Sequence, residues 1–495
     1  MTNSKINADN HGLKFILLLA AYFSLHILLR VLISDSLDYD EAEQALLSQW
    51  LLPGYTEQPP LYSWMQYFLF ELFGKNVFAV SVLKNTLLFL SYLFVYLSGR
   101  RIFKDARAAI LAASSLLLIP QIAWESQRDM THTTLVVFAA AAVLWLIFKL
   151  VEERTPVNYC LLGIFCGIGV LAKANFALFL TILFLTLLTF SKGRKLLFSR
   201  LIFISLALTL AMTAYYFIWM FNNQDIVFSA THKFKQTVET YSARGVWSFF
   251  SATFLFLTPL WFIYFLIFPK KWAYTRRATG FSSQFMLRYG LIFLVTLLFV
   301  VVSFKVSYVK DRWLQPLLFA TPLIFFSGVE LKEMNEKAYN RFLLVVVIAA
   351  IGIYTAFTLR VVGAPLTQNY SRLSYPFTTL AAEIRQAGFS GGLIISDNRF
   401  LAGNMLFQFP NSQALIPDYN FEKIPHSPTS TKAAVIWKAD ASPNIPAKLV
   451  TFLKKRYDFN PTNHPVSCYE QPYKYNSSDT VKLGVLQFPL PQRDP

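Results

Sequence analysis

Charged residues are scarce in this chain, because only 15% of its 495 residues are Asp, Glu, Lys or Arg. A soluble globular domain carries roughly 25% charged residues, so most of this chain is not suited to contact with water. The hydrophobic fraction of 55% and the mean hydropathy of +0.43 indicate the same. The composition therefore predicts an integral membrane protein.

Cysteine is also rare, with three residues in the whole sequence. Cys160 and Cys166 fall in one apolar stretch and Cys468 is isolated near the end of the chain, so neither a zinc-binding spacing nor a disulfide framework is present. No small-residue cleavage site follows the first apolar stretch, residues 13–33, which is too long and too mixed for a signal-peptide core. We expect that stretch to be a retained membrane span.

The apolar runs predict an α-helical polytopic membrane protein with about eleven or more spans, since each span needs about 20 apolar residues. They centre on residues 13–34, 77–98, 106–124, 131–149, 157–172, 174–190, 201–221, 246–268, 286–304, 313–328 and 342–361. The net charge of +17 is better explained by basic cytoplasmic loops than by nucleic-acid binding. With a cytoplasmic N-terminus, four consecutive inside loops are basic, which predicts a multi-pass inner-membrane protein whose active face lies in the periplasm.

The tail has the composition of a soluble domain. We divide the chain into a membrane module, residues 1–362, and a small periplasmic α/β domain, residues 363–495. In the tail, residues 377–388 predict an amphipathic helix, and residues 392–397 and 433–438 predict short buried strands. No phosphate loop or nucleophile motif occurs there, which favours packing or acceptor docking over catalysis.

Acidic residues cluster at the predicted outer ends of two spans. Asp38, Asp40 and Glu41 follow the first span, and Asp129 lies at the outer end of the third. Carboxylates beside a bilayer are candidate functional groups because their desolvation costs free energy. The structural alternative is that they cap the helix that follows.

Several cations lie on the predicted outer side, where the positive-inside rule does not account for them. A phosphate would be a natural partner for them, although snorkelling toward lipid headgroups is the alternative. We assign donor-phosphate binding to Lys173, Arg244, Lys305, Lys310 and Arg312.

Such carboxylates and cations suit sugar transfer from a polyprenyl phosphate, in which cations stabilise the departing phosphate and a carboxylate takes up the acceptor's proton. Metal use is an open question. Asp38 and Asp40 form an Asp-x-Asp pair, and Glu57 with His232 has the donor atoms for zinc. No cofactor is certain, and a histidine such as His232 is more often an ordinary polar loop residue than a metal ligand.

The sequence resembles the GT-C membrane glycosyltransferases of the protein mannosyltransferase and lipid A aminoarabinose transferase type (PMT/ArnT). The matching pieces cover residues 1–330 and are Asp40-Glu41, Glu57-Gln58-Pro59-Pro60-Leu61, Asp129, residues 171–175 and residues 310–316.

The resemblance implies a polyprenyl-phosphate sugar donor and inversion at the anomeric carbon. It implies Asp40 as the principal catalytic carboxylate with Asp129 as its partner, and Lys173 among the phosphate ligands. It also implies a metal site near Glu57 and His232. We add Glu41 as a catalytic candidate, and Glu57, Gln58 and Tyr308 as substrate-binding candidates.

Two departures from the aminoarabinose enzymes put that sugar in doubt. Gln58 stands where they carry Lys, and Glu43 stands where they carry Arg. We expect an inverting transferase that moves another sugar from undecaprenyl phosphate to a glycolipid, either lipid A or the lipopolysaccharide core. Protein O-mannosylation is the second enzymatic hypothesis. A lipid or solute transporter is the rival class, but the two halves of the chain show no internal repeat of the kind common in transporters.

Overall fold

The computed structural model describes residues 2–103, 105–228, 241–268, 280–327, 335–419, 432–440, 442–476 and 478–490. Contacts between Cα atoms divide the chain into two compact units. The first, called here the helical unit, comprises Met1–Ser24, Thr56–Leu61 and Lys84–Ile353. The second, called the mixed unit, comprises Leu25–Tyr55, Tyr62–Leu83 and Tyr354–Pro495. The predicted boundary at residue 362 stays a prediction.

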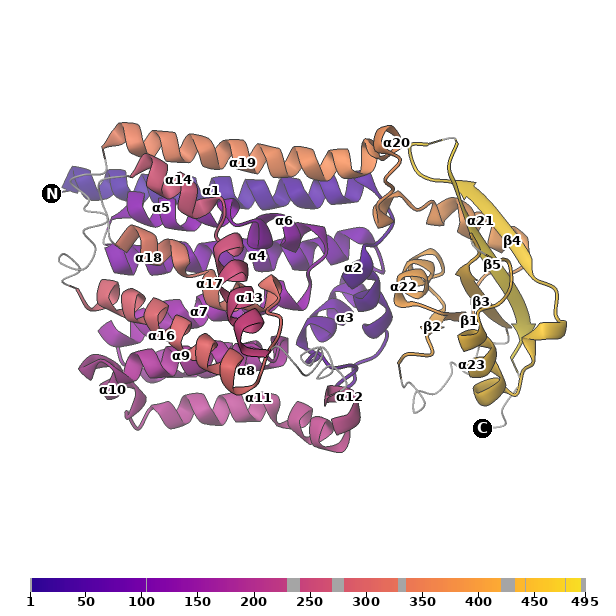
Figure 1. Cartoon of the computed structure of the whole chain (residues 1–495), viewed down its shortest axis with the longest axis horizontal. Coiled ribbons are helices and arrows are strands. Elements are labelled where there is room, and N and C mark those ends of the chain that lie inside the picture. Colours follow the sequence, from indigo (N-terminus) through magenta and orange to yellow (C-terminus); the bar gives the residue numbers. More distant parts are fainter. Residues whose placement is uncertain are drawn as a thin grey trace. The chain divides into compact units, whose positions relative to one another are not determined.

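Most of the helices belong to the helical unit (Figure 1). They are α5 (Ala106–Ser114), η1 (Ser115–Leu118), α6 (Pro120–Arg128), α7 (His132–Glu152), α8 (Pro156–Ala172), α9 (Phe176–Leu188), α10 (Ser191–Leu197), α11 (Ile202–Asn222), α12 (Gln224–Phe228), α13 (Tyr241–Phe256), α14 (Leu260–Ile267), α16 (Phe281–Ser303), α17 (Asp311–Leu318) and α18 (Thr321–Ser327). Three long helices contribute residues to both units: α1 (Thr2–Ile33), α4 (Val77–Phe103) and α19 (Glu336–Val362).

Six of the described helices are long and apolar enough to cross a membrane, namely α4, α7, α11, α16, α19 and residues 10–33 of α1. Two bent pairs, α5 to α6 with a bend of 54° and α13 to α14 with a bend of 58°, raise the number to eight if each is one span. The predicted spans at 157–172 and 174–190 are the shorter helices α8 and α9, and the predicted span at 313–328 is the two short helices α17 and α18. The polytopic helical fold is confirmed, while the number of eleven spans stays a prediction.

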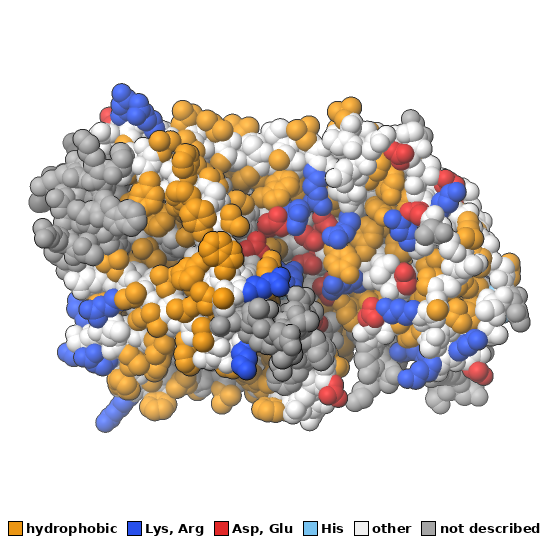
Figure 2. Space-filling view, viewed as in Figure 1, with side chains coloured by type: hydrophobic (Ala, Val, Ile, Leu, Met, Phe, Trp, Pro, Cys, Tyr) orange, Lys and Arg blue, Asp and Glu red, His pale blue; other side chains and the backbone are white. Residues whose placement is uncertain are grey.

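Helix packing in the helical unit follows membrane rules. Exposed hydrophobic side chains cover α11 and α16 (Figure 2), as expected for surfaces that face lipid. Helices α8 and α11 approach closely at Gly163, where a Cβ atom would lie only 2.6 Å from the Ser205 carbonyl oxygen. Small residues let membrane helices pack in this way, and Thr209 Oγ1 donates to the Gly163 carbonyl oxygen at 2.9 Å.

The mixed unit contains a five-stranded sheet in the order β2-β1-β3-β5-β4. Strands β1 and β2, and β1 and β3, are parallel, whereas β5 is antiparallel to β3 and β4. The elements are α2 (Tyr39–Leu47), α3 (Leu61–Phe73), α20 (Ala364–Thr367), η4 (Arg372–Ser374), α21 (Phe377–Gln386), β1 (Leu393–Ser396), α22 (Arg399–Gln408), β2 (Gln413–Leu415), β3 (Lys432–Lys438), α23 (Ala447–Tyr457), η5 (Pro461–Asn463), β4 (Ser467–Pro472) and β5 (Thr480–Pro489).

The central strands β1 and β3 are buried on both faces, whereas the edge strand β4 is largely exposed. Ile394 of β1 belongs to one hydrophobic cluster, whereas its neighbours Leu393 and Ile395 belong to the other. Such central strands are apolar throughout because helices cover both sides of the sheet. The predicted small α/β domain is therefore confirmed, with its helix at α21 and its strands at β1 and β3.

Helix α22 packs directly against α2, the helix that carries the acidic cluster. A Cβ atom on Gly403 would lie 2.1 Å from the Ala42 carbonyl oxygen, so only glycine allows this approach. The buried Asn404 side chain accepts a hydrogen bond from the Leu37 amide at 2.7 Å. These contacts fix the start of α2 against the α/β part of the mixed unit.

Candidate functional site

Asp38 and Glu41 form the cap of α2. Asp38 is the N-cap residue, and its side chain accepts a hydrogen bond from the Tyr39 amide at 2.9 Å. Glu41 Oε2 accepts from the Asp38 amide at 3.0 Å, which completes a capping box. Helix capping, the structural alternative to a catalytic role, thus accounts for the Asp38 and Glu41 carboxylates. These two residues are 1% and 2% exposed.

Three arginines neutralise the buried carboxylates of this cap. Arg30 Nη2 donates to Glu41 Oε2 at 2.7 Å, and the guanidinium also donates to the carbonyl oxygens of Ser34 and Ser36. Arg360 Nη2 lies 2.8 Å from Asp38 Oδ2, and Arg372 Nη1 lies 3.1 Å from Asp38 Oδ1. Both oxygens of Asp38 are occupied by arginine, which favours a structural role for it over the predicted metal role.

Glu43 has its own arginine, Arg399, from the first turn of α22. The Glu43 carboxylate accepts hydrogen bonds from Arg399 and from the Tyr419 hydroxyl. Arg399 lies 356 positions further along the chain, so this pair forms only in the folded mixed unit. Nothing in the sequence identified Arg399 as the partner of Glu43.

Asp40 differs from its acidic neighbours because it is only half-buried. It lies in the first turn of α2, where the helix dipole favours negative charge. Tyr62 is close to it: burial raises the pKa of the Tyr62 hydroxyl well above its usual value, and the charges of Glu41 and Asp40 raise it further. Of the carboxylates predicted to be catalytic in the mixed unit, Asp40 is the one that a reactant can reach.

In the helical unit, Glu57, Lys173 and His132 lie near one another. Lys173 caps the C-terminus of α8, and its Nζ donates to Thr133 Oγ1 at 2.6 Å. The buried His132 interacts electrostatically with both Lys173 and Glu57. Glu57 and Lys173, which were predicted separately from the sequence, thus lie near the same histidine. Gln58, the residue after Glu57, is half-buried.

The remaining predicted phosphate ligands share one neighbourhood of the helical unit. The loop between α16 and α17 contains Lys305, Tyr308 and Lys310, and Arg312 lies in the first turn of α17. The loop lies against α13, because the Val309 amide donates to Ser248 Oγ at 2.9 Å and the Val306 carbonyl oxygen leaves no room for a Cβ at Gly245. Arg244 immediately precedes that glycine. Lys305, Tyr308, Arg312 and Arg244 are all exposed.

Hydrogen bonds connect α17, which follows this loop, to the segments that carry Lys173 and Asp129. Asn175, two residues after Lys173, donates from Nδ2 to the Trp313 carbonyl oxygen at 3.0 Å. Gln315 Nε2 lies 3.0 Å from Met130 Sδ, next to Asp129, which caps the C-terminus of α6. These contacts link, within the helical unit, the segments that carry Lys173, Asp129 and the predicted cations at 305–312.

Lys84 is almost fully buried in α4, and its Nζ lies 3.5 Å from the Gln127 carbonyl oxygen. Sequence reasoning missed Lys84 because it lies inside an apolar run. His232 lies outside the described residues, and among the residues that are described no group of three His, Cys, Asp or Glu side chains is arranged to hold a metal ion.

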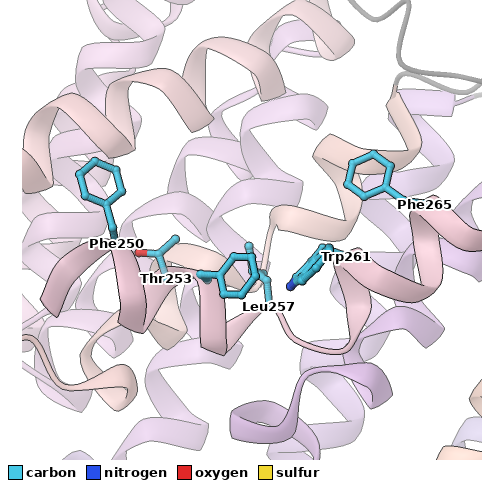
Figure 3. Close-up of a pocket in the computed structure, with 6 residues that line it drawn as sticks. Phe250, Thr253, Leu257, Trp261 and Phe265 are labelled. Atoms are coloured by element: carbon cyan, nitrogen blue, oxygen red, sulfur yellow. The ribbon is translucent and has the colours of Figure 1, made fainter. Parts of the chain in front are cut away.

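An apolar pocket of about 320 Å³ lies at the bend between α13 and α14. Aromatic side chains from both helices line it (Figure 3), and the lining residues are Phe250, Thr253, Phe254, Leu257, Trp261 and Phe265. Such a lining suits a hydrocarbon chain rather than a sugar.

Comparisons with known proteins agree with these features. Residues 57–219 match the family model described as dolichyl-phosphate-mannose-protein mannosyltransferase. The chain is 35% identical over 412 residues to the lipopolysaccharide core galacturonosyltransferase RgtB of Rhizobium johnstonii, covering 81% of this chain and 82% of the relative. It is 33% identical to RgtA of the same organism, covering 85% and 86%.

More distant similarities concern smaller parts or the fold alone. An undecaprenyl phosphate-alpha-4-amino-4-deoxy-L-arabinose arabinosyl transferase of Pseudomonas aeruginosa is 30% identical over 162 residues, which are 30% of this chain and 29% of that enzyme. The crystal structure of ArnT from Cupriavidus metallidurans bound to undecaprenyl phosphate aligns with a TM-score of 0.60 at 15% identity, covering 95% of this chain and 98% of ArnT.

Proposed function

Because the chain belongs to the PMT/ArnT-type GT-C glycosyltransferases, we propose that it moves galacturonic acid from a polyprenyl-phosphate donor to the lipopolysaccharide core. The chain is a multi-pass membrane glycosyltransferase. The names of its relatives RgtA and RgtB support the sugar and the acceptor. The name of the aminoarabinose relative supports undecaprenyl phosphate as the carrier.

The observation that carries the proposal is the polar region of the helical unit. Lys173, residues 305–312 and Arg244 lie along segments that contact one another there. A departing polyprenyl phosphate gains negative charge as its bond to the sugar breaks, and pre-positioned cations stabilise that charge. The apolar pocket between α13 and α14 is our candidate for holding part of the isoprenoid chain.

In the proposed reaction, Asp40 removes the proton from an acceptor hydroxyl as that oxygen attacks the anomeric carbon. A new carbon–oxygen bond forms on one face, while the bond to the phosphate oxygen breaks on the other and leaves its electron pair on the phosphate. The anomeric configuration is therefore inverted. Asp129 supports the reaction by orienting the acceptor or the sugar, and Glu57, Gln58 and Tyr308 bind the substrates.

We place the reaction at the periplasmic face of the inner membrane. The basic loops 100–107, 192–195, 270–277 and 332–341 would then lie in the cytoplasm, as positive-inside topology requires. The predicted outer segments would carry Asp40, Asp129 and the phosphate-binding cations on the side where lipopolysaccharide is completed.

The test is mass spectrometry of lipid A and core oligosaccharide from a deletion strain and from strains complemented with variants. We expect the deletion to remove the mass of one or more hexuronic acids, and wild-type protein but neither Asp40→Asn nor Lys173→Ala to restore it. Asp418→Asn is the matched control, because Asp418 makes an exposed ion pair with Lys448 in the mixed unit. Unchanged glycolipids in the deletion strain would refute the proposal and direct attention to protein glycosylation.

A further inference from the structure

Lys84 is a buried cation that lies about two turns into the long apolar helix α4. It is only 2% exposed, and α4 is otherwise apolar enough to cross a membrane. A charged side chain within a membrane-spanning helix is costly, and such residues are retained where they have a partner and a function. A partner and a role are thus expected for Lys84.

Lys84 and its neighbour Asn85 both contact Gln127 of α6. Lys84 Nζ lies 3.5 Å from the Gln127 carbonyl oxygen, and Gln127 Nε2 donates to Asn85 Oδ1 at 2.8 Å. All three residues belong to the helical unit and are buried. Hydrogen bonds in such surroundings are electrostatically stronger than in water. Two consecutive residues of α4 therefore hold both the main chain and the side chain of Gln127.

This contact lies at the C-terminal end of α6. The last four carbonyl groups of a helix have no partner within it, and Gln127 directly precedes Arg128, the last residue of α6. The helix dipole is negative at this end, which favours a cation there. Lys84 therefore supplies the hydrogen-bond donor and the charge that this buried helix end needs.

Asp129 follows directly from the same helix end. It is the C-cap residue of α6, and its amide donates to the Glu125 carbonyl oxygen at 3.0 Å. From α17, Gln315 Nε2 donates to the Gln121 carbonyl oxygen at 2.9 Å and lies 3.0 Å from Met130 Sδ. Helix α6 has only nine residues and meets α5 at a bend of 54°. Its end is therefore held by contacts with α4 and α17 and not by a straight continuous span.

We propose that Lys84, together with Asn85, is a positioning residue that holds the end of α6 so that Asp129 is correctly placed for the reaction. This inference rests on the proposed function, in which Asp129 orients the acceptor or the sugar. Lys84 acts through α6 and does not bind the donor itself. A misplacement of about 1 Å can lower a rate by about 100-fold, so the hold on α6 matters for turnover.

The experiment is a double-variant cycle with full-length protein in nanodiscs, galacturonosyl undecaprenyl phosphate as the donor and core oligosaccharide as the acceptor. Lys84→Met should lower kcat roughly 10- to 100-fold, whereas the donor KM should change by less than about 2-fold. In an Asp129→Asn background, Lys84→Met should lower kcat by less than about 2-fold, because residues that act through one another are not additive. Asn85→Ala should show the same pattern with a smaller loss, since it removes one of the two contacts.

Lys149→Met is the matched control. Lys149 is also a lysine of a membrane helix, and it lies over the Trp145 ring of that helix at 5.3 Å, so its replacement should leave kcat unchanged. Melting temperatures of all variants are recorded. Asn85→Ala tests the inference if Lys84→Met does not fold, and Asp129→Glu serves as the background if transfer by Asp129→Asn is below detection.

A wild-type kcat in Lys84→Met, or equal losses of kcat in both backgrounds, would overturn the inference, because Lys84 would then not act through Asp129. A raised donor KM at unchanged kcat would also overturn it, because Lys84 would then bind the donor. Transfer by Asp129→Asn at the wild-type rate would refute the role of Asp129 and the inference with it. If wild-type protein uses another sugar on undecaprenyl phosphate, the proposed sugar is wrong, but the same cycle with that donor still tests Lys84.

Discussion

Replacing Glu41 by Gln leaves the Arg30 guanidinium buried without the Glu41 carboxylate. The two side chains are 6% and 2% exposed, and their atoms are 2.7 Å apart. Gln keeps an oxygen that can accept from the Asp38 amide, so the capping geometry is preserved and the lost charge is the main change. Arg30 retains the carbonyl oxygens of Ser34 and Ser36 as partners.

The expected effect on stability is large. Removing one partner of a buried ion pair costs about 3–5 kcal/mol, because the other charge remains desolvated. For a unit of this size each kcal/mol shifts the melting temperature by about 2–4 °C, so we expect a loss of roughly 6–20 °C. The double variant Arg30→Met/Glu41→Gln should recover part of that loss, since it removes the unpaired charge as well.

The assay is thermal unfolding of purified full-length protein followed by tryptophan fluorescence, together with sugar transfer measured well below the melting temperature. Glu470→Gln is the control, because Glu470 pairs with Lys482 at the surface and should leave the melting temperature unchanged. An unchanged melting temperature in Glu41→Gln would refute the argument. Loss of transfer at full stability would instead support the catalytic role that the sequence predicted for Glu41.

Three further variants test other contacts. Gly403→Ala should destabilise the mixed unit by about 1–3 kcal/mol in thermal unfolding, because the new methyl group would collide with the Ala42 carbonyl oxygen. If the variant is as stable as the wild type, α22 can shift to make room for the methyl group. Thr133→Val should raise the donor KM roughly 2- to 10-fold with kcat less affected, since Thr133 positions Lys173. Thr133→Ser should keep the donor KM of the wild type, and an unchanged KM in Thr133→Val would contradict this role. Burial raises the pKa of Asp397, so the folded state binds the proton of the Asp397 carboxyl more tightly than the unfolded state does. The protonated carboxyl stabilises the folded state at low pH, and this stabilisation is lost as pH rises and the carboxyl ionises. Asp397→Asn should therefore raise the melting temperature at pH 7.5 and lose that advantage near pH 4, and a lower melting temperature at pH 7.5 would refute the sign.

The membrane character of the fold could be predicted from the sequence because hydropathy is a local property. Apolar runs located α4, α7, α11, α16 and α19, and turn residues located β1 and β3 in the tail. The interruptions were less visible. The breaks between α13 and α14, at Pro259, and between α17 and α18, next to Pro322, fall inside apolar runs and are therefore not marked by hydropathy.

The candidate site was predictable in part. Asp40, Lys173 and the cations at residues 305–312 were selected because charged residues beside a membrane are conspicuous. The number and order of the acidic residues in the sequence do not show which carboxylates are accessible in the folded protein. Capping and burial separate Asp38 and Glu41 from Asp40, and both depend on the folded environment of α2.

The sequence alone determined that this is a multi-pass membrane protein with a small α/β domain and a set of charged residues typical of polyprenyl-phosphate-dependent sugar transfer. Only the tertiary structure decided which charges meet. Asp38 pairs with arginines 322 and 334 positions away, and Glu43 with an arginine 356 positions away. Hydrophobic patterns can be recognised within a span of about 20 residues, whereas an ion pair requires two residues to meet in space at any separation along the chain.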